Sequence, residues 1–147
     1  MNEIEILNRE MTKEELKQMY TGFNTHTIDN GVEVQDSTRH SYTAVSGEQF
    51  IGCSSGLAYK NGTVYSGWFY LTDLFVEKGF RKMGLGSKLL LNLEAEIKII
   101  DVKQIWTWTA GYEAPSFYQK LGYTIFTEME NWYSDGSSRV GLKKKLK

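Results

Sequence analysis

The chain has 147 residues, of which 41% are hydrophobic and 14% aromatic, and its formal net charge is −1. This composition argues against disorder and predicts one compact domain over residues 1–147. A charge near zero argues against a general attraction to nucleic acid or to an anionic membrane. No apolar run is long enough to span a bilayer, and no signal-peptide pattern opens the chain. The single cysteine, Cys53, cannot form an internal disulfide, so we expect a cytoplasmic protein.

The first 40 residues predict a strand, a helix and a polar connection. Residues 3–7 alternate as a strand does, and Thr12 with Glu15 forms the pattern of a helix capping box. The apolar face of this helix consists of Leu16, Met19, Tyr20 and Phe23. Residues 24–39 are polar, with a turn at Asn30-Gly31 and room for a second short helix.

The middle of the chain predicts an antiparallel set of strands. Residues 42–45 and 50–59 have strand patterns, and the turn pair Asn61-Gly62 leads into a third strand at residues 64–76, largely buried over 71–76. Gly52 and Gly56 are expected to weaken the second strand or to introduce a bulge.

The second half predicts alternating helices and strands. A helix over residues 85–100 has an apolar face of Leu85, Leu89, Leu93 and Ile97. A strand at 104–109 and a short helix at 114–121 follow, and two closing strands cover 123–129 and 138–146.

The junction at residues 81–86, Arg-Lys-Met-Gly-Leu-Gly, predicts a binding site for a phosphate-bearing ligand. Gly84 and Gly86 allow a tight turn at a helix start, where backbone N–H groups lack intrahelical acceptors. Arg81 and Lys82 add positive charge at a helix end that disfavours cations, which indicates a bound anion. Two other phosphate motifs fail: the dinucleotide fingerprint requires glycine where Leu89 stands, and the P-loop requires lysine where Leu85 stands.

Two motifs resemble those of the GNAT superfamily of N-acetyltransferases. The acetyl-CoA loop of that family commonly reads V-x-P-x-x-R-x-x-G-x-G, and Val76, Arg81, Gly84 and Gly86 match it, with Lys78 at the proline position. Residues 114–123 resemble the second signature, A-x-x-F-Y-x-x-x-G-F/Y. The resemblance covers roughly residues 64–147 and is greatest to small bacterial members, many without an assigned substrate.

The resemblance implies an α/β (or α+β) fold with a single mixed, mainly antiparallel sheet and helices on both faces. It also implies acetyl-CoA as cosubstrate, with no metal. The expected cofactor-binding residues are the end of the strand and the loop after it: Leu74, Phe75, Val76, Arg81, Lys82, Met83, Gly84, Leu85, Gly86 and Ser87. In the family the pantetheine arm pairs with this strand, and a backbone N–H near Val76 polarises the acetyl oxygen.

Tyr118 occupies the position from which the family's tyrosine protonates the departing sulfur. A phenol with a pKa of about 10 is a suitable donor to a thiolate. The base that deprotonates the amine is open: Asp73 is a candidate if a strand bulge redirects it, and Glu77, His26 and His40 are others. The expected substrate cleft contains Tyr70, Thr72, Trp132 and Tyr133.

The acceptor is expected to be a primary amine of a small molecule or peptide, acetylated by direct attack in a ternary complex. Alternatives are another acyl donor or acceptor, a CoA-binding regulatory domain with little turnover, and an interaction module. No nucleic-acid or membrane partner is expected, and a homodimer is compatible with the family. Gly111 departs from the asparagine common in the family, which removes one contact with the cofactor. Trp106 and Trp108 are expected to pack, and Cys53 to be a small buried hydrophobe.

Overall fold

The structure is a computed structural model that describes residues 2–113 and 115–146. The chain divides into two compact units, Met1–Val34 and Gln35–Lys147, and each unit is described by itself. The predicted phosphate-loop residues, Tyr118 and Asp73 belong to the second unit, whereas the candidate base His26 belongs to the first.

The first unit contains one helix, α1 (Lys13–Asp29). The predicted capping box is confirmed: the Glu15 backbone N–H donates to the Thr12 hydroxyl at 3.2 Å, and the Thr12 N–H donates to the Glu15 carboxylate at 3.3 Å. The helix continues to Asp29, into the first part of the expected polar connection at residues 24–39, and no second helix follows among residues 30–34. The predicted strand at residues 3–7 is wrong, because these residues form no regular structure. A strand must pair its backbone with a neighbour, and this unit supplies none.

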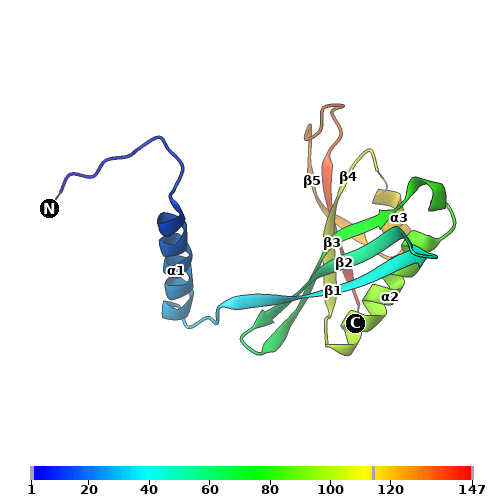
Figure 1. Cartoon of the computed structure of the whole chain (residues 1–147), viewed down its shortest axis with the longest axis horizontal. Helices are drawn as coiled ribbons and strands as arrows, with labels where there is room; N and C mark the ends of the chain where they lie inside the picture. Colours follow the sequence, from blue (N-terminus) through cyan, green and yellow to red (C-terminus); the bar gives the residue numbers. More distant parts are fainter. Residues whose placement is uncertain (1, 114, 147) are drawn as a thin grey trace. The chain divides into compact units, whose positions relative to one another are not determined.

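The second unit is a six-stranded sheet with two α-helices (Figure 1). The strand order is β1-β2-β3-β4-β6-β5, and only the β3–β4 pair is parallel. The mixed, mainly antiparallel sheet predicted from the sequence is therefore confirmed. The elements are β1 (Gln35–Ser46), β2 (Gln49–Asn61), β3 (Val64–Val76), the 3-10 turn η1 (Lys78–Phe80), α2 (Leu85–Ile99), β4 (Gln104–Ala110), α3 (Pro115–Lys120), β5 (Thr124–Met129) and β6 (Arg139–Lys145).

The core lies on one face of the sheet, beneath α2 and α3. The α2 side chains Leu90, Leu93 and Ile97 and the α3 side chain Tyr118 belong to one buried cluster with residues of the sheet. A buried polar group ties α2 to the closing strands: Glu94 accepts from the Tyr123 hydroxyl at 2.7 Å and from the Lys144 ammonium at 2.7 Å. This arrangement fixes the second half of α2 against the closing strands.

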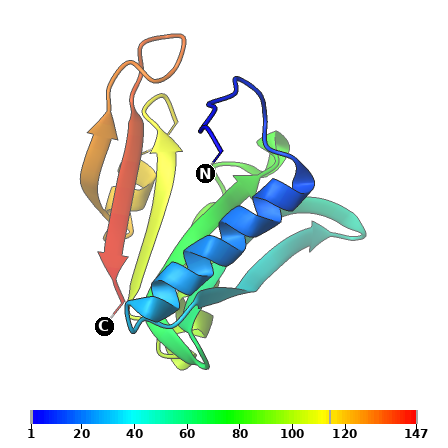
Figure 2. The ribbon, with the colours of Figure 1, turned by 90° about the vertical axis from the view of Figure 1, so that its left-hand side faces the viewer.

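Parallel pairing of β3 with β4 stops early, which opens a fork in the sheet. The register runs only from Trp68 opposite Gln104 to Tyr70 opposite Trp106. Figure 2 shows β3 (green) and β4 (yellow) close together at one end and diverging toward the other. Beyond the fork, no strand of the described residues pairs with the edge of β3 that faces β4.

A bulge lies in β3 at the fork. Ser55 of β2 pairs with Asp73, but Gly56 pairs with Leu71, so Thr72 is the extra residue. The irregularity predicted from Gly56 is therefore present, with the inserted residue in the neighbouring strand. Residues 71–76 are less buried than predicted, because Asp73 and Phe75 are exposed.

Candidate active site

The loop before α2 has the geometry of an anion site. Gly84 is the N-cap of α2 in the left-handed conformation, at φ +79°, and Lys82 also has positive φ, at +64°. The first helical hydrogen bond runs from the Lys88 N–H to the Gly84 carbonyl, at 3.1 Å. The N–H groups of residues 85–87 precede that bond and are available to a ligand.

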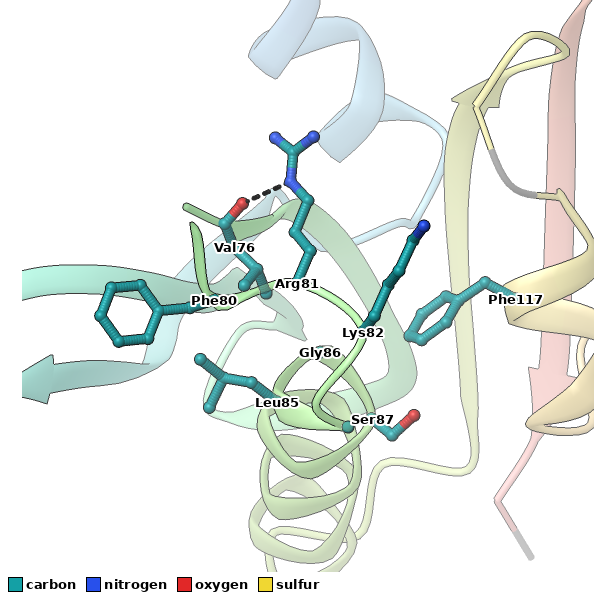
Figure 3. Close-up of a pocket in the computed structure, with 9 residues that line it drawn as sticks. Val76, Phe80, Arg81, Lys82, Leu85, Gly86, Ser87 and Phe117 are labelled. Carbon is teal, nitrogen blue, oxygen red and sulfur yellow. Dashed lines mark hydrogen bonds between the residues drawn. The ribbon is translucent and has the colours of Figure 1, made fainter. Parts of the chain in front are cut away.

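A cavity of about 400 Å³ lies over this helix start. Its walls come from the end of β3, the loop, the first turn of α2, and α3, which places both sequence motifs around one space (Figure 3). The lining residues are Val76, Phe80, Arg81, Lys82, Gly84, Leu85, Gly86, Ser87 and Phe117. The sequence analysis predicted all of these as cofactor residues except Phe80 and Phe117, although Phe117 belongs to the second motif.

The two cations of the loop are placed differently. The Arg81 Nε donates to the Val76 carbonyl at 2.9 Å, which ties the loop to the end of β3. The Lys82 side chain extends beside Phe117 (Figure 3). Arg81 therefore shapes the loop as well as adding charge, and Lys82 is the freer of the two to meet a phosphate.

Three predicted cofactor residues lie outside the cavity lining. The Leu74 side chain packs against the core cluster, and the Phe75 ring stacks on Phe50 at 6.1 Å between centroids. Met83 is 68% exposed. Of Leu74 and Phe75, only the backbone at the unpaired edge of β3 could meet a ligand, as the family resemblance implies.

Tyr118 is buried beside the fork. Its side chain is 8% exposed and makes edge contacts with the rings of Phe117 and Tyr123. Burial, with a smaller contribution from the Glu113 charge, raises the pKa of Tyr118 to about 12, while a hydrogen bond with Thr107 acts in the opposite direction. Thr107 also donates its hydroxyl to the Leu71 carbonyl at 2.9 Å, across the opening between β4 and β3.

A second, polar pocket of about 220 Å³ lies at the fork. It is bounded by β3, by the end of β4 with its following loop, and by the segment around the start of β6. Its walls are Tyr70, Thr72, Trp108, Thr109, Ala110, Tyr112, Glu113, Tyr133 and Arg139. The structure thus brings together three of the four predicted cleft residues, Tyr70, Thr72 and Tyr133.

The other two predicted residues of the acceptor side lie apart from this lining. Trp132 does not line the pocket, but its ring centroid lies 5.2 Å from the guanidinium carbon of Arg139, which does. Asp73 is exposed, accepts a hydrogen bond from the Thr72 hydroxyl at 2.7 Å, and lies 4.0 Å from Arg39. Thr72, the bulge residue, lines the pocket, and Asp73 is next to it in sequence but does not line it.

Sequence reasoning missed Glu113 and Arg139, the two charged residues of this pocket. Glu113 directly precedes the second motif, and a carboxylate there was a usable signal. Arg139 reaches the pocket because β6 pairs it with Ala110 at the end of β4, and no local pattern reveals that pairing.

Gly111, the departure from the family pattern, is accounted for by close backbone contact. Its N–H donates to the Ser138 carbonyl at 2.7 Å, and an added Cβ would lie 3.1 Å from that oxygen. A side chain at this position would therefore crowd the neighbouring segment.

Two further predictions about aromatic and thiol groups are modified. Trp106 and Trp108 share a part-exposed face: Trp106 stacks on Tyr70 at 4.1 Å between ring centroids, and both indoles border an open aromatic groove. Cys53 is only partly buried, and burial followed by the Asp73 charge raises its pKa. Within residues 2–113 and 115–146, no helix is long and apolar enough to cross a membrane, and no cluster of metal-ligating side chains is found.

Comparison with known proteins agrees with this geometry. Residues 37–125 match the family model of the acetyltransferase (GNAT) domain. A blasticidin-S acetyltransferase of Streptomyces morookaense is 35% identical over 86 residues, which are 56% of this chain. The matched region spans 61% of that relative's length.

Solved structures share the fold. An acetyltransferase from Bacillus cereus ATCC 14579 matches with a TM-score of 0.76 at 21% identity, over 95% of this chain and 97% of the other. An aminoglycoside 6'-N-acetyltransferase solved in complex with coenzyme A matches with a TM-score of 0.61 at 22% identity, over 74% of this chain and 73% of the other. Since the family model covers more than half of the residues, the chain belongs to the GNAT family of acetyltransferases.

Proposed function

We propose that the protein transfers acetyl from acetyl-CoA to a primary amine of a small molecule or peptide. The observation that carries the proposal is the fork between β3 and β4, with an anion-binding helix start beside it and a polar pocket at its mouth. A cosubstrate and an acceptor can meet at this fork in one ternary complex. The coenzyme A complex of the aminoglycoside acetyltransferase supports the choice of cosubstrate.

The residues of the first cavity fit the phosphates of coenzyme A. The N–H groups of residues 85–87 would bind phosphate oxygens, with Lys82 adding a counter-charge. The free edge of β3 offers backbone groups to the amide-bearing pantetheine arm. When bound, acetyl-CoA supplies an acetyl group activated as a thioester, whose thiolate leaves as the new C–N bond forms.

Tyr118 would donate a hydrogen bond to the departing sulfur. Its pKa of about 12 keeps the phenol protonated throughout the physiological range. Relative to a thiol with a pKa of about 8.5, complete proton transfer from this phenol would be uphill by roughly 5 kcal/mol. We therefore expect Tyr118 to stabilise the thiolate by a hydrogen bond, with solvent completing its protonation.

Two carboxylates are candidates to take the proton of the incoming ammonium. Asp73 is engaged by Thr72 and lies near Arg39, outside the pocket lining. Glu113 lines the pocket and accepts a hydrogen bond from the Thr109 hydroxyl at 3.2 Å. We favour Glu113, and comparing Glu113→Gln with Asp73→Asn tests the choice: the more damaging substitution identifies the base.

The proposal is tested by thiol release from acetyl-CoA with a panel of amines that includes blasticidin S, an aminoglycoside and a short peptide. Turnover should occur with at least one amine. In Tyr118→Phe the rate should fall about 10- to 100-fold, a decrease at or below the usual contribution of general acid–base catalysis. A regulatory domain would bind coenzyme A but release no thiol with any amine. An unchanged rate in Tyr118→Phe would refute the role of the phenol.

The remaining expectations, a cytoplasmic location and assembly as a homodimer, are part of the same proposal. Sedimentation of the purified chain at several concentrations tests the homodimer.

A further inference from the structure

The pocket at the fork contains two opposite charges that do not neutralise each other. Glu113 follows β4, and Arg139 begins β6. Among residues 2–113 and 115–146, neither side chain forms an ion pair within 4.0 Å. Two unpaired charges facing one cavity form a template for a ligand that carries the reverse pair.

Glu113 is an exposed residue whose carboxylate accepts a hydrogen bond through one oxygen and still has capacity to accept through the other. Thr109 donates its hydroxyl to Oε2 at 3.2 Å, and the Glu113 backbone N–H donates to the Ala110 carbonyl at 3.0 Å. Within the described part of the chain, Oε1 accepts no hydrogen bond. An ammonium group has three N–H donors and suits this free oxygen.

The Arg139 guanidinium is held by aromatic rings and not by acceptors. Its carbon lies 4.9 Å from the Trp108 ring and 5.2 Å from the Trp132 ring. No oxygen of the described residues accepts a hydrogen bond from it. A guanidinium positioned by ring contacts keeps its N–H groups for a bidentate interaction with a carboxylate.

We infer that the acceptor is an amino acid or a similar amino-carboxylate, with its ammonium on Glu113 and its carboxylate on Arg139. This inference rests on the proposed function and specifies its substrate class. Glu113 would also take one ammonium proton, directly or through a water, which breaks an N–H bond, forms an O–H bond and leaves the lone pair on nitrogen.

The rest of the pocket is compatible with a flat side chain on the acceptor. Tyr70, Tyr112 and Tyr133 line it, and the last two rings meet edge to face at 5.1 Å between centroids. Aromatic amino acids are therefore suitable probes of the inference.

The experiment compares matched amines that differ only in the carboxylate: tyrosine with tyramine, and tryptophan with tryptamine, in the thiol-release assay with acetyl-CoA. We expect kcat/KM to be about 10- to 100-fold higher for the amino acid of each pair, the range for a hydrogen bond to a charged group. Equal or better turnover of the decarboxylated amines would overturn the inference.

Variants of two of the four cationic residues on β6 supply the matched control. Arg139→Gln should bring the ratio of kcat/KM between tyrosine and tyramine close to one, by lowering turnover of tyrosine. Lys143→Gln, on the same strand but outside the pocket, should retain the ratio. A ratio unchanged in Arg139→Gln, or lost equally in both variants, would contradict the assigned role.

The two proposals fail in different ways. Turnover of blasticidin S, an aminoglycoside or a peptide without turnover of any amino acid would overturn the inference and leave the proposed function intact. No thiol release with any amine would contradict the proposed function and the inference with it.

Discussion

Substitution of Gly86 by alanine should separate ligand binding from folding. A Cβ at Gly86 would lie 3.5 Å from the Phe117 ring and 3.8 Å from a Val76 methyl, both ordinary contacts. Alanine is favoured over glycine within a helix by about 0.5–1 kcal/mol, so we expect the free energy of unfolding to stay the same or rise by up to about 1 kcal/mol. The new methyl group would nevertheless enter the cavity at the start of α2.

The expected loss is in affinity for coenzyme A. If the methyl lengthens one hydrogen bond from the helix start to a phosphate, the cost is about 1.5–3 kcal/mol, or roughly a 10- to 100-fold increase in Kd. Gly84→Ala is the contrasting variant: its Cβ would meet nothing within 4 Å, but the φ of +79° should cost about 1–2 kcal/mol of stability.

Urea denaturation and calorimetric titration with coenzyme A measure both quantities. The reasoning is refuted if Gly86→Ala binds coenzyme A within about twofold of the parent chain, because the helix start would then not approach the ligand. Equal destabilisation by the two substitutions would refute the assigned contacts.

Three further predictions concern single groups. Lys144→Met removes the ammonium that pairs with the buried Glu94 carboxylate and leaves the bond from the Tyr123 hydroxyl. The free energy of unfolding, measured in urea, should fall by about 3–5 kcal/mol. A fall below about 1 kcal/mol would show that the ion pair adds little. Because the pKa of Tyr118 is raised to about 12, its contribution to the free energy of unfolding is complete below about pH 10 and is lost as the pH rises toward 12. Between pH 7 and pH 11, Tyr118→Phe should therefore lose less stability than the parent chain when unfolding is measured at both pH values. Cys53 should react slowly with iodoacetamide near pH 8, because burial and then the Asp73 charge raise its pKa. The reaction should be faster in Asp73→Asn, and an unchanged rate would contradict the influence of Asp73.

Local patterns were sufficient to predict much of the second unit. The limits of β3 follow from the turn at Asn61-Gly62 and the polar residue after Val76, and the structure confirms them. The apolar spacing of α2 places Leu89, Leu93 and Ile97 on the buried face, as expected. These features depend on interactions between near neighbours in sequence, which a pattern can reveal.

Features that depend on pairing between distant segments were predicted poorly. Residues 3–7 have the alternation of a strand but no partner in their unit. Arg139 lines the polar pocket at the fork because β6 pairs it with Ala110, and the rings of Trp108 and Trp132 contact its guanidinium. The motifs therefore predicted most of the residues that line the cavity at the start of α2, while the lining of the polar pocket at the fork needed the tertiary structure.

The measurement that tests the central claim most directly is a calorimetric titration of the purified protein with acetyl-CoA. The account predicts micromolar binding by the parent chain, its loss in the double variant Arg81→Glu, Gly84→Asp, and its retention in Lys98→Gln, which changes a charge at the other end of α2. Failure of the intact chain to bind, or equal binding by the double variant, would contradict the assignment of the loop at residues 81–87 as the cofactor site.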